Sequence, residues 1–217
     1  MQRKIAEQVY SLLLREYPAS RESPSTVARG SPFEVLILTI LSAQTTDRAV
    51  ILVKKPLFAR YPTPAALATA KAAEVEPIIH SLGFYHAKTQ HIIAAAQKLV
   101  AEFGGDVPQT MEELLTIPGV GRKTANIVLY HGYGKNEGIA VDTHVRRLAQ
   151  RIGFSATDNV ATIERDLMRV FPKNTWGYLT DVFIANGRAC CTAKKPGCGQ
   201  CPISTYCRYF SETEKPH

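Results

Sequence analysis

The sequence predicts an all-α fold, because helix signals recur along its whole length and no segment shows the alternating apolar and polar pattern of a strand. Two capping boxes, Ser31 with Glu34 and Thr110 with Glu113, mark helix starts. Gly104 follows a long helical stretch and marks a helix end. The 217 residues, 45% of them hydrophobic, are enough to bury a core, either as one large domain or as two small lobes.

The predicted helices follow one another along the chain. The first covers 5–17, and the second begins after Ser31, has Pro32 at its first position and stops near Gln44. Pro56 should kink or end the third helix. Periodicity and turn signals predict the third helix over 47–61, a short helix from Thr63, and helices over 72–82 and 86–103. Two further helices should lie on either side of the turn PGVG. The last helices are predicted over 142–152, 159–171 and 174–187.

The helix over 86–103 should bury one apolar face, whereas the residues after 187 should be loop-like. The residues of the expected buried face are Ile92, Ile93, Ala96, Leu99, Val100 and Phe103.

Basic side chains outnumber acidic ones, 26 against 19, so the formal charge is +7 and the pI about 9.2. This balance favours a polyanionic partner over a neutral one, although many basic proteins bind no nucleic acid. The most apolar stretch, 33–43, is too short to cross a bilayer and carries Glu34, and no targeting segment is visible. We therefore expect an intracellular protein without a membrane partner.

The segment LLTIPGVGRKTANIVLY has the form helix, glycine turn, helix. Pro118 ends the first helix, and Gly119 and Gly121 allow a sharp turn and positive φ. The amide hydrogens of the turn and the N-terminus of the next helix would then form an anion site that fits a DNA phosphate, with Arg122 beside it. The alternative is an ordinary connection between two helices.

Lys123 and Asp142 are the candidate catalytic residues. A lysine in the first turn of a helix is electrostatically misplaced, since helix N-termini prefer acids, and a role as an amine nucleophile is one explanation. The alternative is a surface lysine that binds phosphate. Asp142 precedes a helix and could simply cap it, or its carboxylate could stabilise a positively charged sugar.

All five cysteines lie between residues 190 and 207, which favours a metal site over a disulfide framework. Six, two and five residues separate the four candidate ligands Cys191, Cys198, Cys201 and Cys207. Four thiolates suit tetrahedral zinc or an iron–sulfur cluster equally well on ligand count, and Cys190 is left over. Lys194 and Lys195 in the same segment could contact phosphate, or could belong to a solvated basic loop.

Taken together, LSAQTTD, LLTIPGVGRKTANIVL, AVDTH and the cysteine spacing resemble endonuclease III, from about residue 30 to Cys207. That family belongs to the helix–hairpin–helix DNA glycosylases that carry a [4Fe-4S] cluster. The resemblance implies that Lys123 attacks the sugar and forms a Schiff base, that Asp142 is the catalytic aspartate, and that the four candidate cysteines bind the cluster.

The resemblance also implies two side chains that enter the DNA. Gln44, in LSAQTTD, matches a residue inserted into the gap left by an everted base. The segment SLGFYHAK resembles the loop that wedges into the opposite strand, with Phe84 where the family often has leucine. Asp47 matches an acidic residue near the pocket, although a helix cap is an equally good interpretation.

The implied architecture is two helical lobes: a six-helix barrel with the hairpin over 25–136, and a second lobe of 1–24 and 137–217 that holds the cluster. The implied function is a monomeric glycosylase and abasic-site lyase that removes oxidised pyrimidines from double-stranded DNA and cleaves the strand by β-elimination. The alternatives are a mismatch-specific thymine or adenine glycosylase and a non-catalytic DNA-binding module with zinc. The lysine and the short tail argue against the two mismatch enzymes.

Overall fold

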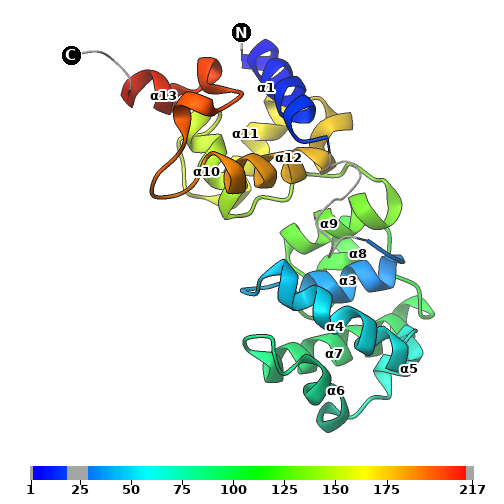
Figure 1. Cartoon of the computed structure of the whole chain (residues 1–217). Helices are drawn as coiled ribbons and strands as arrows, with labels where there is room; N and C mark the ends of the chain where they lie inside the picture. Colours follow the sequence, from blue (N-terminus) through cyan, green and yellow to red (C-terminus); the bar gives the residue numbers. More distant parts are fainter. Residues whose placement is uncertain (1, 19–28, 214–217) are drawn as a thin grey trace. The chain divides into compact units, whose positions relative to one another are not determined.

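The computed structural model describes residues 2–18 and 29–213, and every regular element in that part of the chain is a helix (Figure 1). The prediction of an all-α fold is therefore confirmed. The chain divides into two compact units. We call Ser25–Lys135 the central unit, and Met1–Pro24 together with Asn136–His217 the discontinuous unit.

The central unit is built around one helix that is apolar on all sides. Its helices are α3 (Pro32–Leu41), α4 (Asp47–Arg60), α5 (Pro64–Ala68), α6 (Ala72–Ile79), α7 (Tyr85–Phe103), α8 (Met111–Leu115) and α9 (Arg122–Tyr133). In α3 every residue from Val35 to Leu41 is buried, as expected of a helix without a polar face. It packs against α7 and α9. The hydroxyl of Thr39 donates to the Val35 carbonyl at 2.6 Å, so the one polar side chain in this run has a partner.

The capping signals fix the helix starts as predicted, with one difference. At α3, the Ser31 amide donates to the Glu34 carboxylate at 3.0 Å and the Glu34 amide donates to the Ser31 hydroxyl at 3.2 Å, a complete capping box. At α8, the Glu113 amide donates to the Thr110 hydroxyl at 3.3 Å. The Glu113 carboxylate, however, accepts from that same hydroxyl at 2.7 Å instead of from the backbone.

Several boundary predictions were wrong. Pro56 does not end α4, because the proline is on the exposed side while Val53 and Leu57 are buried; a kink at Pro56 stays a prediction. Helix α6 ends at Ile79, earlier than predicted. Val100 is 42% exposed, so the buried face of α7 is narrower than the apolar pattern suggested. The residues after 187 are not all loop, since they include the helix Arg208–Thr213.

The discontinuous unit joins the first helix to the last third of the chain. Its elements are α1 (Gln2–Glu16), α10 (Thr143–Ile152), α11 (Val160–Val170), η2 (Lys173–Thr175), α12 (Trp176–Ala189), η3 (Cys198–Gln200), η4 (Ser204–Tyr206) and α13 (Arg208–Thr213). Helix α1 packs against α11 and α12. In the core, the ring of Phe171 meets Phe154 at 5.1 Å and Phe183 at 6.0 Å between centroids, both edge to face.

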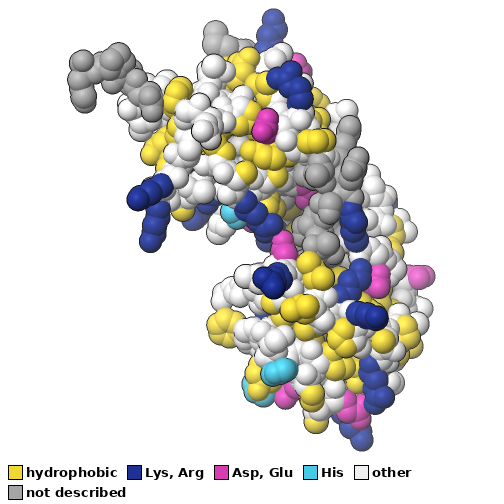
Figure 2. All heavy atoms as spheres, in the orientation of Figure 1, with side chains coloured by type: hydrophobic (Ala, Val, Ile, Leu, Met, Phe, Trp, Pro, Cys, Tyr) yellow, Lys and Arg dark blue, Asp and Glu magenta, His cyan; other side chains and the backbone are white. Residues whose placement is uncertain are grey.

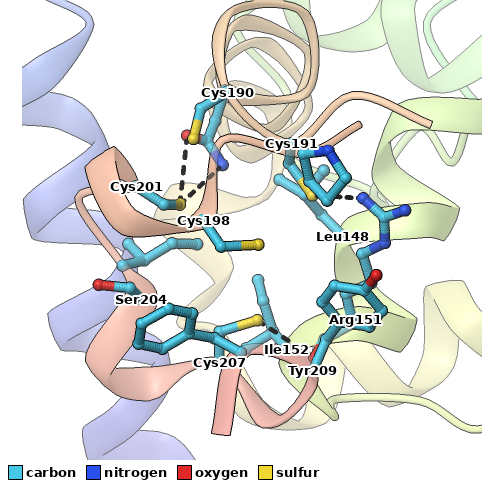
Figure 3. Close-up of a pocket in the computed structure, with 14 residues that line it drawn as sticks. Leu148, Arg151, Ile152, Cys190, Cys191, Cys198, Cys201, Ser204, Cys207 and Tyr209 are labelled. Carbon is cyan, nitrogen blue, oxygen red and sulfur yellow. Dashed lines mark hydrogen bonds between the residues drawn. The ribbon is translucent and has the colours of Figure 1, made fainter. Parts of the chain in front are cut away.

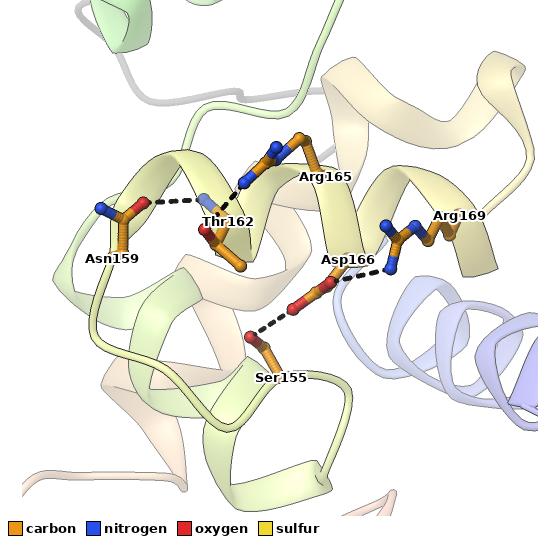
Figure 4. Close-up of polar contacts among 6 residues, drawn as sticks. All are labelled: Ser155, Asn159, Thr162, Arg165, Asp166 and Arg169. Atoms are coloured by element: carbon orange, nitrogen blue, oxygen red, sulfur yellow. Dashed lines mark hydrogen bonds and ion pairs between the residues drawn. The ribbon is translucent and has the colours of Figure 1, made fainter.

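Polar contacts hold α11 to the loop before it (Figure 4). Asn159 caps the helix by accepting from the Thr162 amide at 3.0 Å. The Ser155 hydroxyl donates to the Asp166 carboxylate at 2.7 Å, and Arg169 lies 3.4 Å from the other oxygen of that carboxylate. None of the helices within residues 2–18 and 29–213 has the length and hydropathy of a membrane span.

We predict that His131 makes the fold less stable in acid. Burial of this α9 side chain lowers its pKa from 6.5 to about 4. The unfolded chain then binds the proton more readily, so stability should fall as the pH drops from about 6.5 towards 4, by at most roughly 3 kcal/mol. Urea unfolding of wild type and His131→Gln across this range should show a flatter pH dependence for the variant.

The exposed His80 offers a matched control for the loss of a histidine, in the variant His80→Gln. An unchanged slope in His131→Gln would contradict the prediction.

Candidate nucleic-acid interface and metal centre

The turn between α8 and α9 requires glycine at one of its two glycine positions. Gly119 has φ +79, and a Cβ there would lie 3.2 Å from side-chain atoms of both His91 and Ile40. The backbone of the turn therefore approaches α7 and α3 more closely than any other residue would allow. The amide of Val120 donates to the Ile117 carbonyl at 3.1 Å and closes the turn.

The second glycine of the turn has another role, and the prediction of positive φ was wrong for it. Gly121 has φ −101, and a Cβ there would meet nothing within 4 Å. It is the N-cap of α9, and no side chain caps that helix end. The cap of α9 therefore carries no side chain that would obstruct the approach of an external anion to the amide hydrogens of the first turn.

Arg122 and Lys123 form the start of α9, and both are exposed. Their positively charged side chains lie at the N-terminal end of α9, which is also the positive end of the helix dipole. Such a combination suits a phosphate group. Figure 2 shows Lys and Arg side chains scattered over the face in view instead of gathered in one patch, so the net charge alone does not locate the interface.

Asp142 caps α10, as one of its two interpretations predicted. Its Oδ1 atom accepts from the amides of His144 at 2.9 Å and Val145 at 2.8 Å. Both capping bonds use the same oxygen, and within the described residues Oδ2 has no hydrogen bond. The carboxylate is therefore held in one orientation with an acceptor oxygen remaining. Asp142 belongs to the discontinuous unit and Lys123 to the central unit, and a pocket shared by the two stays a prediction.

Gln44 and Phe84 share an unusual backbone conformation. They are the two non-glycine residues with positive φ in the described chain, at 52 and 59 degrees. Both are exposed, and Phe84, the N-cap of α7, is 69% exposed. Left-handed backbone at non-glycine residues is strained and tends to occur at functional sites. Asp47 is not a cap, since Thr46 caps α4 by accepting from the Ala49 amide at 3.4 Å.

The cysteines of the discontinuous unit surround a pocket (Figure 3). The sulfur atoms of Cys191, Cys198 and Cys207 point into this space. Within the described residues, no three His, Cys, Asp or Glu side chains converge closely enough to hold a single metal ion. Four thiols that line one pocket suit an iron–sulfur cluster, in which each sulfur binds a different iron.

The leftover thiol already has a partner. Cys190 lines the same pocket, but its thiol donates to the Gly197 carbonyl at 3.0 Å, and the Gly197 amide donates back to the Cys190 carbonyl at 3.0 Å. This pair closes the loop before Cys198. Lys194 and Lys195, within that loop, are exposed.

Two polar residues that the sequence analysis missed surround the cysteines. Arg151 donates to the sulfur of Cys191 at 3.2 Å, to the Thr192 carbonyl at 2.8 Å and to the Ala193 carbonyl at 3.0 Å, and the Cys207 thiol donates to its carbonyl at 3.4 Å. Hydrogen bonds to cysteine sulfur stabilise the thiolate and tune a cluster.

Asn186 in α12 is the second of them, and it is fully buried. Its side-chain amide lies 3.9 Å from the Cys201 sulfur, and its carbonyl side chain accepts from the Tyr17 hydroxyl at 3.0 Å. Its backbone carbonyl accepts from the amides of Cys190 and Cys191. The sequence signal for these residues was weak, since it consisted of the spacing of Arg151 one helical turn after Arg147. The structure shows that the Nε atom of Arg147 also contacts the cysteine segment, by donating to the Cys191 carbonyl at 2.8 Å.

Comparisons with known proteins agree with these features. Residues 37–173 match the family of HhH-GPD superfamily base excision DNA repair proteins, and residues 191–207 match the iron–sulfur binding domain of endonuclease III. The chain is 46% identical to the endonuclease III of Synechocystis, over 93% of this chain and 91% of that protein. It is 39% identical to the endonuclease III of Thermotoga maritima, over 85% and 86% respectively.

Solved structures give the same result. A trapped covalent intermediate of endonuclease III with DNA is 35% identical, with a TM-score of 0.87 and 99% of both chains covered. A thermostable thymine-DNA glycosylase is 21% identical with a TM-score of 0.86, over 96% of this chain and 98% of that one, and shares the fold. The chain therefore belongs to the endonuclease III family of the HhH-GPD superfamily of base excision DNA repair proteins.

Proposed function

We propose that this chain is a DNA glycosylase and abasic-site lyase of base excision repair that removes oxidised pyrimidines from double-stranded DNA as a monomer. The observation that supports the proposal most is the 35% identical endonuclease III that was solved as a covalent intermediate with DNA, because the likeness extends over 99% of both chains. A covalent intermediate needs a nucleophile, and the exposed Lys123 supplies an amine beside the uncapped helix end.

In the proposed reaction, Lys123 and Asp142 act on one extruded nucleotide. The amine of Lys123 forms a bond to the sugar C1′ atom while the bond from C1′ to the base breaks, and the base leaves with that electron pair and takes up a proton. The Oδ2 atom of Asp142 stabilises the positive charge that develops on the sugar, while Oδ1 keeps the carboxylate in place through the two capping bonds.

The second half of the proposed reaction breaks the strand. The sugar ring opens and leaves an imine between C1′ and Lys123, which acidifies the hydrogens on the neighbouring C2′ atom. Loss of one of these protons expels the 3′ phosphate by β-elimination. Water then releases the lysine amine from the shortened sugar.

The proposed DNA contacts come from both units. In the central unit, the amides after Gly121 and the side chain of Arg122 bind phosphate, and Gln44 and Phe84 fill the space left by the extruded base. Extrusion costs a few kcal/mol and is least costly for a damaged base. In the discontinuous unit, Lys194 and Lys195 contact phosphate. We propose that the central unit corresponds to the six-helix barrel lobe and the discontinuous unit to the cluster lobe.

The family carries a [4Fe-4S] cluster, and the residues present fit it. We propose Cys191, Cys198, Cys201 and Cys207 as its ligands. When bound, the cluster would have a structural role, because its ligands would join the segment that follows α12 to the segment before α13. Arg151 and Asn186 orient the thiolates through the contacts described above.

The alternatives have less support. The likeness to a thymine-DNA glycosylase, at 21% identity, shows the shared fold alone. A non-catalytic module with one zinc ion would need cysteines that converge on a point, whereas here they line a cavity.

Borohydride trapping should identify the nucleophile and separate it from the carboxylate. We expect wild type to form a reduced covalent adduct with DNA that contains an abasic site, and Lys123→Ala to form none. Asp142→Asn should keep the helix cap, because asparagine is an equally good N-cap, yet should release a damaged base at least about 100-fold more slowly. The exposed Lys55→Ala serves as the control for loss of a lysine. An undiminished adduct with Lys123→Ala would refute the assignment.

Substitution of the two hairpin glycines should affect stability at one position and DNA binding at the other. Gly119→Ala should lower the free energy of unfolding by about 1–3 kcal/mol, since both the positive φ and the contact with α7 oppose a side chain. Gly121→Ala should cost less than about 1 kcal/mol, because the space is open. It should nevertheless weaken DNA binding roughly tenfold, because the methyl group hinders approach to the amides. Equal stability of the two variants would contradict this account.

Substitution of the cysteines should distinguish ligands from the bystander. Serine at position 191, 198, 201 or 207 should reduce bound iron and the visible absorbance of the purified protein, because each thiolate holds one iron. Cys190→Ser should keep both, since a serine hydroxyl can still donate to the Gly197 carbonyl. Iron loss with Cys190→Ser and retention with Cys191→Ser would reverse the assignment.

A further inference from the structure

Lys88 is a buried lysine that the proposed reaction does not use. It lies in the second turn of α7 and is 4% exposed. Burial lowers the pKa of its side chain, and no acidic residue contributes to the shift. Among the described residues, its ammonium group has one hydrogen-bond partner, the hydroxyl of Thr45. A buried amine without a carboxylate opposes folding, so a role in function would explain its presence.

The partner of Lys88 fixes the turn that contains Gln44. Thr45 accepts from the Lys88 ammonium through its hydroxyl, and the same hydroxyl donates to the Ala43 carbonyl at 3.3 Å. This chain of two hydrogen bonds joins the residues on both sides of Gln44. It therefore holds the backbone where Gln44 adopts positive φ.

The same lysine lies near the start of α7 and makes the first backbone hydrogen bond of that helix, to its N-cap Phe84. The Lys88 amide donates to the Phe84 carbonyl at 3.0 Å, and Phe84 is the other non-glycine residue with positive φ in the described chain. One residue thus joins two strained turns that lie forty residues apart in the sequence, through its ammonium at one and its amide at the other. The buried Lys88 side chain therefore attaches the Gln44 turn to the helix that Phe84 begins.

We propose that Lys88 is a positioning residue that holds Gln44 and Phe84 at a fixed separation, so that both side chains enter the duplex together when a base is extruded. The proposal rests on the proposed function, because it assigns Gln44 and Phe84 to the DNA. It differs from a phosphate contact, since a side chain with 4% exposure does not reach a phosphate on the surface.

The test compares a step that needs extrusion with one that does not. Lys88→Met removes the hydrogen-bond donor and keeps the side-chain length. Thr45→Val removes the acceptor, whereas Thr45→Ser keeps the hydroxyl and serves as its matched control. The extrusion substrate is a duplex with a single thymine glycol, assayed for base release in a single turnover. The reference substrate is single-stranded DNA with an abasic site, assayed by borohydride trapping.

We expect Lys88→Met and Thr45→Val to slow base release from the duplex about 10- to 100-fold. The loss on the single-stranded reference should be smaller by about tenfold or more. Thr45→Ser should keep most of the wild-type rate of base release. The double variant Lys88→Met/Thr45→Val should be no slower than either single variant, because both remove the same interaction.

Other outcomes would overturn the proposal. Equal losses on both substrates would indicate general damage to the fold, and an unchanged rate on the duplex would show that the contact is not used. A decrease of about one in the slope of log affinity against log salt for Lys88→Met would show a phosphate contact instead. A wild-type protein that forms no adduct on the reference substrate would refute the proposed function itself.

Discussion

The arrangement of the central unit depends on how closely its neighbours approach one face of α7. Phe84 caps α7, and Lys88 and His91 follow within its first two turns, three residues apart, on the same side of the helix. The strained Phe84 turn lies at the start of α7, and the Gln44 turn is hydrogen-bonded to Lys88 through Thr45. The hairpin turn packs closely against His91, because Gly119 has no side chain to separate them. One rigid helix therefore sets the relative positions of all three elements that we assign to DNA. Loops positioned on such a scaffold can be both exposed and accurately placed.

Helix α10 has a comparable place in the discontinuous unit. Its N-cap is Asp142, and its later turns hold the cysteine segment through Arg147 and Arg151. The contact between α10 and α12 is close as well, since a Cβ at Gly187 would lie 2.6 Å from the His144 ring. The proposed catalytic carboxylate and the proposed cluster ligands are thus attached to the same short helix. This makes a structural use of the cluster consistent with a reaction that needs no electron transfer.

Local signals accounted for most of what could be predicted from the sequence. Caps such as Ser31 and Asp142, and the end signal Gly104, act through neighbouring backbone groups, so their helices begin and end where expected. The candidate cysteines likewise lie close together in the sequence and line one pocket.

The remaining features depend on contacts that sequence spacing does not reveal. Pro56 is tolerated because its exposed side loses one backbone bond while the opposite side stays buried. Positive φ at Gln44 and Phe84 was not expected, since the sequence favours glycine for that conformation. The contact of Lys88 with Thr45 spans 43 positions. Cys190 is distinguished from Cys191 by hydrogen bonds, since the Cys190 thiol donates to Gly197 whereas the Cys191 sulfur accepts from Arg151.

The position of α1 has a consequence for how the protein is made on the ribosome. This helix is synthesised before its partners α11 and α12, and Tyr17 pairs with Asn186, which is synthesised 169 residues later. The central unit is contiguous, so it can fold while translation continues. Helix α1 therefore cannot pack against α11 and α12 until the chain beyond the central unit has been synthesised. Assembly of the cluster therefore follows the synthesis of the whole central unit.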